Sequence, residues 1–147
     1  MGEIETGGGK TQGTGLWLYR EHWEQMREHV DAQVPFEACG LVAGQLGRSR
    51  AVFHIENVLY SPVRFRMEPA QQVQALIQID ENQWDLLAIY HSHPNGPAAP
   101  SVTDLNETTF PDTIALIWSP RELDWICRGF ILQEGEFNEL PVQVIDR

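Results

Sequence analysis

The chain has 147 residues, and its hydrophobic (42%) and charged (21%) fractions are those of one globular domain of ordinary size. These values exclude a disordered or collagen-like chain, and a (β/α)₈ barrel would need about 250 residues. The net charge of −11 argues against nucleic acid as a partner, because an acidic surface repels polyphosphate. Two cysteines are too few for a disulfide framework, and no apolar run approaches the roughly 18 residues that span a bilayer. We therefore expect a soluble cytoplasmic protein with no membrane partner.

The N-terminal part of the chain predicts a leader followed by an amphipathic helix. Residues 1–15 are polar and contain six glycines, which predicts a disordered leader. No second linker is visible, so residues 16–147 are expected to form one domain. Apolar side chains recur at i, i+4, i+7 and i+11, which predicts a helix over about 19–33. They belong to Tyr19, Trp23, Met26 and Val30.

Short apolar runs predict the strands of a sheet. These runs are residues 36–43, 50–58, 63–67, 84–93, 113–119, 124–132 and 140–145. Pro69 begins a second predicted helix, which runs to about Asn82 with Val73, Leu76 and Ile77 facing inward. A third, short helix is expected after Ser101. This mixture predicts an α/β fold, with a central mixed β-sheet sandwiched between helices.

Two histidines lie at the end of the predicted strand over 84–93. His91 and His93 are two residues apart, so their side chains share one face of the strand. Such a pair suits a divalent metal such as zinc, which binds imidazole nitrogen at about 2.0–2.1 Å. The alternative is that two polar residues simply mark the point where the strand leaves the core.

Ser101 and Asp104 also have two interpretations. A serine followed three residues later by an acid is the signature of a helix capping box. A capped helix beside the histidines would also hold Asp104 in a fixed direction, and the short loop over 94–100 leads back to His93. Two imidazoles and one carboxylate leave an open zinc position, which is the pattern of a catalytic site.

Glu37 is the charged residue of the apolar run over 36–43. A lone carboxylate is costly to bury, so it either faces solvent at the entry of the strand or has a functional partner. The functional interpretation is a general base that takes a proton from an activated water. Cys39 shares a strand face with Glu37, although a free cysteine in such a strand is usually a core residue.

The spacing of these residues resembles the JAMM (MPN+) metalloprotease motif. The matching residues are Glu37, His91, Ser92, His93, Ser101 and Asp104. Flanking segments that also resemble the family are residues 37–44, 61–65 and 89–94. The resemblance covers about residues 16–145, and it implies the MPN (JAMM) fold, an α/β sandwich.

The same resemblance implies the chemistry. One zinc ion per chain would be held by His91, His93 and Asp104, with Glu37 as acid/base and Ser101 as the group that stabilises the oxyanion. Family members cut peptide or isopeptide bonds after the C-terminal Gly-Gly of ubiquitin or ubiquitin-like proteins. The chain has no room for the insertions of eukaryotic deubiquitinases, and it is most similar to compact prokaryotic enzymes that trim a sulfur carrier protein.

The implied partner is thus a ubiquitin-like or sulfur carrier protein with a Gly-Gly C-terminus. We expect its tail to lie as an extended strand beside the strand that carries the histidines. The sequence leaves the oligomeric state open, and a homodimer is one option.

Three alternatives compete with this interpretation. Two histidines and a carboxylate also form the facial triad of non-haem iron oxygenases, but those sites usually occur in all-β folds. A metallo-β-lactamase type of site needs further ligands just after His93, where the chain has Asn95 and Gly96. The third alternative is a non-catalytic MPN-type module that binds a ubiquitin-like partner, although such modules typically lack the motif.

Overall fold

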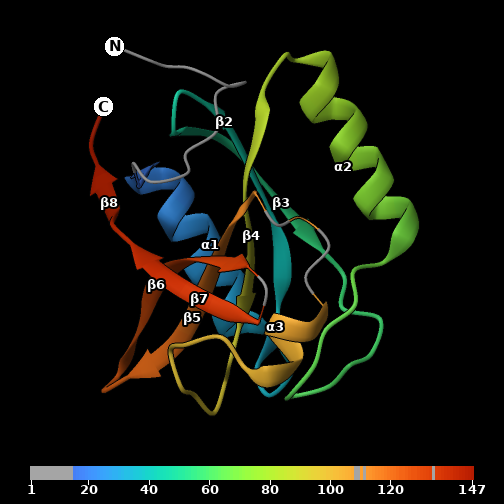
Figure 1. The fold of residues 1–147 in the computed structure, drawn as a ribbon, viewed down its shortest axis with the longest axis vertical. Helices are drawn as coiled ribbons and strands as arrows, with labels where there is room; N and C mark the ends of the chain where they lie inside the picture. The colour runs from blue at the N-terminus through green and yellow to red at the C-terminus, as the bar shows by residue number, and fades with distance from the viewer. Residues whose placement is uncertain (1–14, 108–109, 111, 134) are drawn as a thin grey trace.

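A computed structural model describes residues 15–107, 110, 112–133 and 135–147 (Figure 1). Apart from Gly15, the predicted leader lies outside the described residues. The elements in chain order are β1 (Leu16–Tyr19), α1 (Arg20–Gln33), β2 (Cys39–Gln45), β3 (Arg48–Ile55), α2 (Pro69–Glu81), β4 (Asp85–Ser92), α3 (Val102–Glu107), β5 (Ile114–Arg121), β6 (Asp124–Gln133), β7 (Glu136–Leu140) and β8 (Val142–Ile145). No helix in these described ranges is long and apolar enough to cross a membrane.

The strands form one mixed sheet in the order β7-β6-β5-β4-β2-β3-β1-β8. The β4–β5 pair is parallel, as are the β1–β3 and β1–β8 pairs, and the remaining pairs are antiparallel. The two outer strands, β7 and β8, are separated in the chain by Pro141 alone, whose carbonyl oxygen accepts a 3.0 Å hydrogen bond from the Leu16 amide. The sheet therefore curls until its two edges meet.

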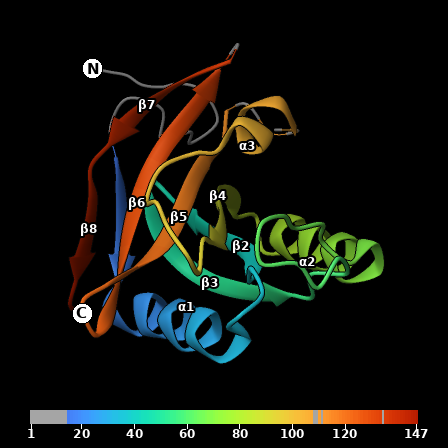
Figure 2. The same cartoon turned by 90° about the horizontal axis from the view of Figure 1, so that it is seen from below.

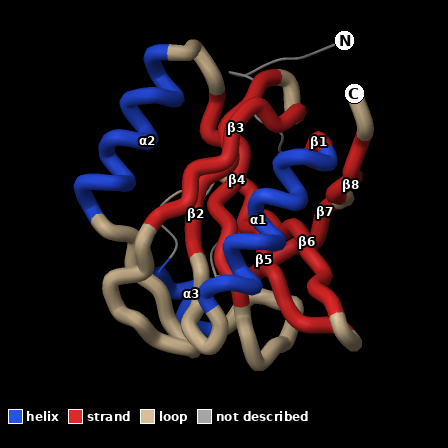
Figure 3. The backbone as a smooth tube through the Cα atoms, turned by 180° about the vertical axis from the view of Figure 1, so that it is seen from behind, coloured by secondary structure: helices blue, strands red, loops and turns tan. Residues whose placement is uncertain are grey.

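Helices cover both faces of this sheet. Helix α1 packs on one face, and α2 and α3 lie on the other (Figures 2 and 3). Side chains of the central strands point alternately to the two faces of the sheet. Tyr90 and Trp118 belong to the core under α1, whereas Ile117 packs with Leu105 of α3. A third cluster joins β2 to Ala75 and Ile79 of α2. The predicted α/β fold, a mixed sheet between helices, is confirmed.

Two local expectations are wrong. Residues 63–67 do not form a sheet strand, because this segment makes one isolated bridge between Asn57 and Met67. Leu76 packs against the core beside Ala75 and Ile79, as expected, whereas Val73 is 54% and Ile77 50% exposed. Ala75 and Ile79 are one helical turn apart on the face toward the sheet, and Val73 and Ile77, each two residues from them, fall on the opposite side.

Candidate metal centre

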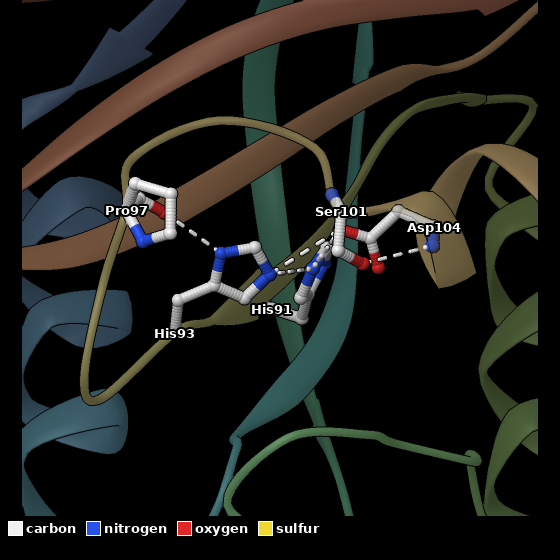
Figure 4. Close-up of polar contacts among 5 residues, drawn as sticks. All are labelled: His91, His93, Pro97, Ser101 and Asp104. Atoms are coloured by element: carbon white, nitrogen blue, oxygen red, sulfur yellow. Dashed lines mark hydrogen bonds and ion pairs between the residues drawn. The ribbon is translucent and has the colours of Figure 1, made fainter.

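His91 and His93 stand together where β4 ends. His91 is in the strand, paired with Cys39 of β2 and Ile117 of β5, and His93 follows one residue after the strand. Both are buried, and their rings turn the same way, so that the two Nε2 atoms are 3.0 Å apart (Figure 4). The ring of Phe65 stacks on His91 at 4.6 Å between centroids. The predicted convergence of the two imidazoles is thus present.

Asp104 reaches the same point from the first turn of α3. Its Oδ2 lies 3.2 Å from the Nε2 of His91 and 3.2 Å from the Nε2 of His93. The capping box is present as well, since the Ser101 hydroxyl oxygen accepts from the Asp104 amide at 3.0 Å and the Ser101 amide donates to Asp104 Oδ2 at 2.8 Å. The two interpretations of this pair therefore coexist: the cap of the helix aims the carboxylate at the histidines (Figure 4).

This donor set fits a four-coordinate cation. The carbonyl oxygen of Pro97 lies 2.8 Å from His93 Nδ1, and it can only accept, so the neutral ring carries its proton there and presents the Nε2 lone pair to the site. The three distances among the Nε2 and Oδ2 atoms, 3.0, 3.2 and 3.2 Å, are close to the roughly 3.3 Å between donors of a tetrahedral zinc ion.

Electrostatics at the site favour a positive charge among these atoms. Burial alone would raise the pKa of Asp104, but hydrogen bonds with His91 and His93 hold it well below its usual range. Burial likewise lowers the pKa of His93, yet its bonds to Asp104 and Pro97 outweigh burial and raise it. The carboxylate is therefore ionised at neutral pH and available as a ligand.

Glu37 is the second carboxylate of the site. Glu37 precedes β2 and is 3% exposed. One of its carboxylate oxygens and ring nitrogens of His91 and His93 all lie within 4.8 Å of one another. Burial raises the pKa of Glu37 to about 8, the His93 charge lowers it, and the charge of Asp104 raises it further. The solvent-facing alternative for Glu37 is wrong: its carboxyl group is enclosed and titrates near neutrality.

Several residues that hold the site in place were not predicted. The Ser92 hydroxyl oxygen accepts from the Ala38 amide at 2.8 Å, and the Ser92 amide donates to the Ala38 carbonyl at 3.0 Å. The Asn57 side chain donates to the Glu37 carbonyl at 3.0 Å. These bonds fix the backbone that follows Glu37, because the Glu37 carbonyl and the Ala38 amide belong to the same peptide unit. Their only sequence signal was the position of Ser92 between the two histidines.

Cys39 does not face the metal centre as a ligand. It is buried, its thiol donates to the Ile55 carbonyl at 3.4 Å, and burial raises its pKa to about 12. A thiol with so high a pKa is protonated at neutral pH and makes a poor nucleophile.

A cavity of about 360 Å³ opens beside the histidines on the α2 and α3 side of the sheet. Its lining includes His91 and Asp104 at one end and the guanidinium-bearing residue Arg66 on the loop before α2. Apolar lining is provided by Phe65, Met67, Ile89 and Leu132. An extended peptide segment can thus approach the metal centre over an apolar floor.

The expectation that a substrate tail pairs with the edge of the histidine strand is wrong. Residue His91 of β4 is paired with Cys39 on one side and with Ile117 on the other. The chain returns after α3 as β5, parallel to β4, and occupies the edge that a tail would need. No edge of β4 is free beside His91, and the open space next to it is the cavity over the face of the sheet.

Comparison with known proteins places this geometry in a family. Residues 20–125 match the family described as prokaryotic homologs of the JAB domain. A probable TtuB-protein conjugate cleaving protease of Thermus thermophilus is 34% identical over 135 residues, which cover 91% of this chain and 87% of the relative. The CysO-cysteine peptidase of Mycobacterium tuberculosis is 31% identical over 125 residues, 83% of this chain and 86% of that protein.

Solved structures agree with this assignment. A protein from Desulfitobacterium hafniense has a solution structure with a TM-score of 0.81 and 30% identity, covering 90% of this chain and 94% of the other. A JAB1/MPN domain protein from Archaeoglobus fulgidus shares the fold at a TM-score of 0.57 and 17% identity, over 89% of this chain and the full length of that chain. On the matched sequence and the shared fold, this chain belongs to the family of prokaryotic JAB-domain homologues.

Proposed function

We propose that the chain is a zinc metallopeptidase that hydrolyses the bond after the C-terminal Gly-Gly of a ubiquitin-like or sulfur carrier protein. The observation that carries the proposal is the convergence of His91, His93 and Asp104 on one point beside a buried Glu37. The curated relatives, one named as a conjugate-cleaving protease and one as a peptidase, support the same chemistry. In this proposal residues 16–147 are the catalytic domain.

The ligands in this proposal are His91, His93 and Asp104, because their donor atoms form the tightest triangle of the site, 3.0–3.2 Å on each side. A carboxylate oxygen of Glu37 and ring nitrogens of His91 and His93 lie within 4.8 Å of one another, a wider spacing than in the triangle. We therefore assign Glu37 as the base and not as a ligand. A bound zinc ion supplies a Lewis acid that makes water acidic near neutral pH.

Glu37 takes the proton of the attacking water and returns it to the leaving amine. A general base works best when its pKa is near the working pH, and burial raises the pKa of Glu37 to about 8. This value is that of the metal-free site, and a zinc ion bound nearby would favour the ionised form that accepts the proton. The bonds from Ser92 and Asn57 fix the backbone from which the Glu37 side chain extends.

Ser101 stabilises the oxyanion of the tetrahedral intermediate. Its hydroxyl oxygen accepts from the Asp104 amide, and in that arrangement the hydroxyl proton remains available to donate to the substrate carbonyl. Loss of one such donor typically lowers the rate by about 10²–10³-fold. The capping bond orients the hydroxyl group before substrate arrives.

Glycines suit the approach to this site. Gly-Gly has no side chain, so its backbone can pass close to His91 and Asp104 at the end of the cavity, while bulkier residues clash. The preceding residues of the carrier's tail then lie along the apolar floor. A non-catalytic binding module would not need a base with a raised pKa beside a complete ligand set.

The proposal is tested with three substrates given to the zinc-loaded protein, followed by intact mass spectrometry. They are a small carrier protein with one residue added after Gly-Gly, the same carrier with its last Gly replaced by Val, and the isolated tail peptide. We expect loss of the added residue from the first, a much lower kcat/KM for the second, and weak cleavage of the third, since binding energy from the carrier's body is absent. Equal cleavage of all three would indicate a non-selective peptidase.

A further inference from the structure

We propose that Arg128 is a positioning residue for the metal centre, acting through the loop over 94–100 on the ring orientation and tautomer of His93. The inference rests on the proposal that His93 is a metal ligand. It assigns a role to a residue two strands away from β4, which touches neither a ligand nor the cavity.

The guanidinium of Arg128 makes three hydrogen bonds, one from each of its nitrogens. On β6, Arg128 is paired with Ile117 of β5, which in turn is paired with His91, so the three residues form one row across the sheet. Its Nε and Nη2 atoms donate to the two carboxylate oxygens of Glu139 on β7, at 2.8 and 2.5 Å. The remaining Nη1 donates to the carbonyl oxygen of Ala98 at 3.0 Å. The bidentate pair with Glu139 therefore aims the third nitrogen at the loop.

Ala98 is the residue next to the one that orients His93. The Pro97 carbonyl oxygen lies 2.8 Å from His93 Nδ1 (Figure 4). The carbonyl oxygens of Pro97 and Ala98 belong to consecutive peptide units. Holding the second oxygen restricts rotation of the first, because each peptide unit is planar and only two torsions at Ala98 separate them. Arg128 thus limits where the Pro97 oxygen can lie.

Few other hydrogen bonds could hold the loop if the bond from Arg128 to the Ala98 carbonyl, here called the tether, were lost. Within the described part of the chain, residues 94–100 also make a turn bond, from the Gly96 amide to the His93 carbonyl at 2.8 Å, and the contact of the Pro97 carbonyl with His93. Both are local to the loop. Arg128 supplies the bond that fixes the loop to another strand of the sheet.

The consequence concerns the proton on His93. A firmly placed Pro97 oxygen keeps the ring proton on Nδ1, which leaves Nε2 unprotonated and able to ligate. Without the tether the oxygen moves, the alternative tautomer with the proton on Nε2 gains population, and metal affinity falls. Removal of groups that orient a metal ligand in this way typically costs about 10–100-fold in affinity.

The experiment compares Arg128→Met, Arg128→Lys and a control, Arg20→Met, in the full chain. Arg20 is also exposed and pairs with a carboxylate, Asp146, at 2.8 Å, but it lies on α1, away from the loop. The first measurement is the zinc dissociation constant, by competition with a chromophoric chelator. The second is the ¹⁵N chemical shifts of the His93 ring in metal-free protein, which report the tautomer. Urea unfolding shows that each variant is folded.

We expect Arg128→Met to raise the zinc dissociation constant by about 10-fold or more and to move the His93 shifts toward protonation at Nε2. Arg128→Lys should have a smaller effect in the same direction, because one ammonium cannot bond Glu139 bidentately and Ala98 together. Arg20→Met should match the parent. Unchanged zinc affinity and unchanged His93 shifts in both Arg128 variants would overturn the inference while leaving the proposed function intact. A parent chain that binds no zinc would overturn both. If Arg128→Met does not fold, Arg128→Lys decides alone.

Discussion

Replacing Glu37 by Gln should stabilise the metal-free protein, and the gain should grow with pH. The side chain is 3% exposed, and burial raises its pKa from 4.5 to about 8. A carboxyl group with a raised pKa binds its proton more tightly in the folded state than in the unfolded state. Its contribution to stability is therefore complete below pH 4.5 and is lost as the pH rises from there toward 8. Gln has nothing to ionise and escapes this loss.

The size of the effect follows from the pKa difference. At 1.36 kcal/mol per pKa unit, ionisation of Glu37 destabilises the fold by less than about 1 kcal/mol at pH 5 and by about 4 kcal/mol at pH 8. The difference in unfolding free energy between Glu37→Gln and the parent should thus increase by about 3 kcal/mol between these pH values. A constant offset from the substitution itself cancels in this comparison.

Urea unfolding of both proteins, with a chelator present and at several pH values, measures this difference. Glu139→Gln is a control with a flat response in this range: its hydrogen bond to Arg128 lowers the pKa of Glu139, so the stability gained from its ionised form is complete above pH 4.5, and the difference between variant and parent should stay constant from pH 5 to 8. A Glu37→Gln difference that stays flat from pH 5 to 8, or that falls, would refute the enclosed, near-neutral carboxyl group.

Two further substitutions test the site and the sheet beneath it. Ser101→Ala should lower kcat by about 10²-fold and cost about 1 kcal/mol of stability, since both the oxyanion donor and the cap of α3 are lost, and Ser101→Thr should recover most of both. A parent-like kcat in Ser101→Ala would remove the oxyanion role. Gly40→Ala should destabilise the fold by about 3 kcal/mol in urea unfolding, because a Cβ there would lie 2.3 Å from the Phe53 carbonyl oxygen and 2.3 Å from the Tyr90 ring. A stability loss below about 1 kcal/mol would mean that the β2–β4 contact adjusts easily.

Strong local patterns made much of the fold predictable. The helical spacing that ends at Val30 and the proline that begins α2 each marked a helix within one or two residues of its observed bounds. The apolar run over 36–43 and the run over 50–58 were recognisable as strands, which pair as β2 and β3, and the run that ends in His91 and His93 was recognisable as β4. In these segments local preference and tertiary packing agree.

The segments that were missed depend on contacts that no local pattern contains. Strand β7 is exposed at four of its five residues and lacks apolar alternation, so only its pairing with β6 makes it a strand. Residues 63–67 alternate like a strand but meet no partner beyond the Asn57 bridge. Strand β1 has four residues and continues directly into α1, so the helical pattern masks it.

In the candidate site, too, some residues could be predicted from the sequence and others depend on contacts that only the fold creates. The side chains that converge, from Glu37 to Asp104, were identifiable because the motif constrains their types and spacing. The groups that hold them act through backbone atoms: the Pro97 carbonyl, the Ala38 amide and the Ala98 carbonyl accept or donate whatever the side chain is. Residue types therefore carry no signal for them, and Arg128 could not be linked to His93 before the fold was known.

The most direct test of the site is to measure bound zinc and turnover on the same samples of the parent, Glu37→Gln and Asp104→Ala. The parent should hold one zinc per chain and cleave a Gly-Gly-extended carrier. Glu37→Gln should also hold one zinc per chain but lose at least about 10²-fold in rate, because its base is gone and its ligands are intact. Asp104→Ala should lose both zinc and activity. A Glu37→Gln protein that binds no zinc, or one that cleaves as fast as the parent, would contradict the division of the two carboxylates into ligand and base.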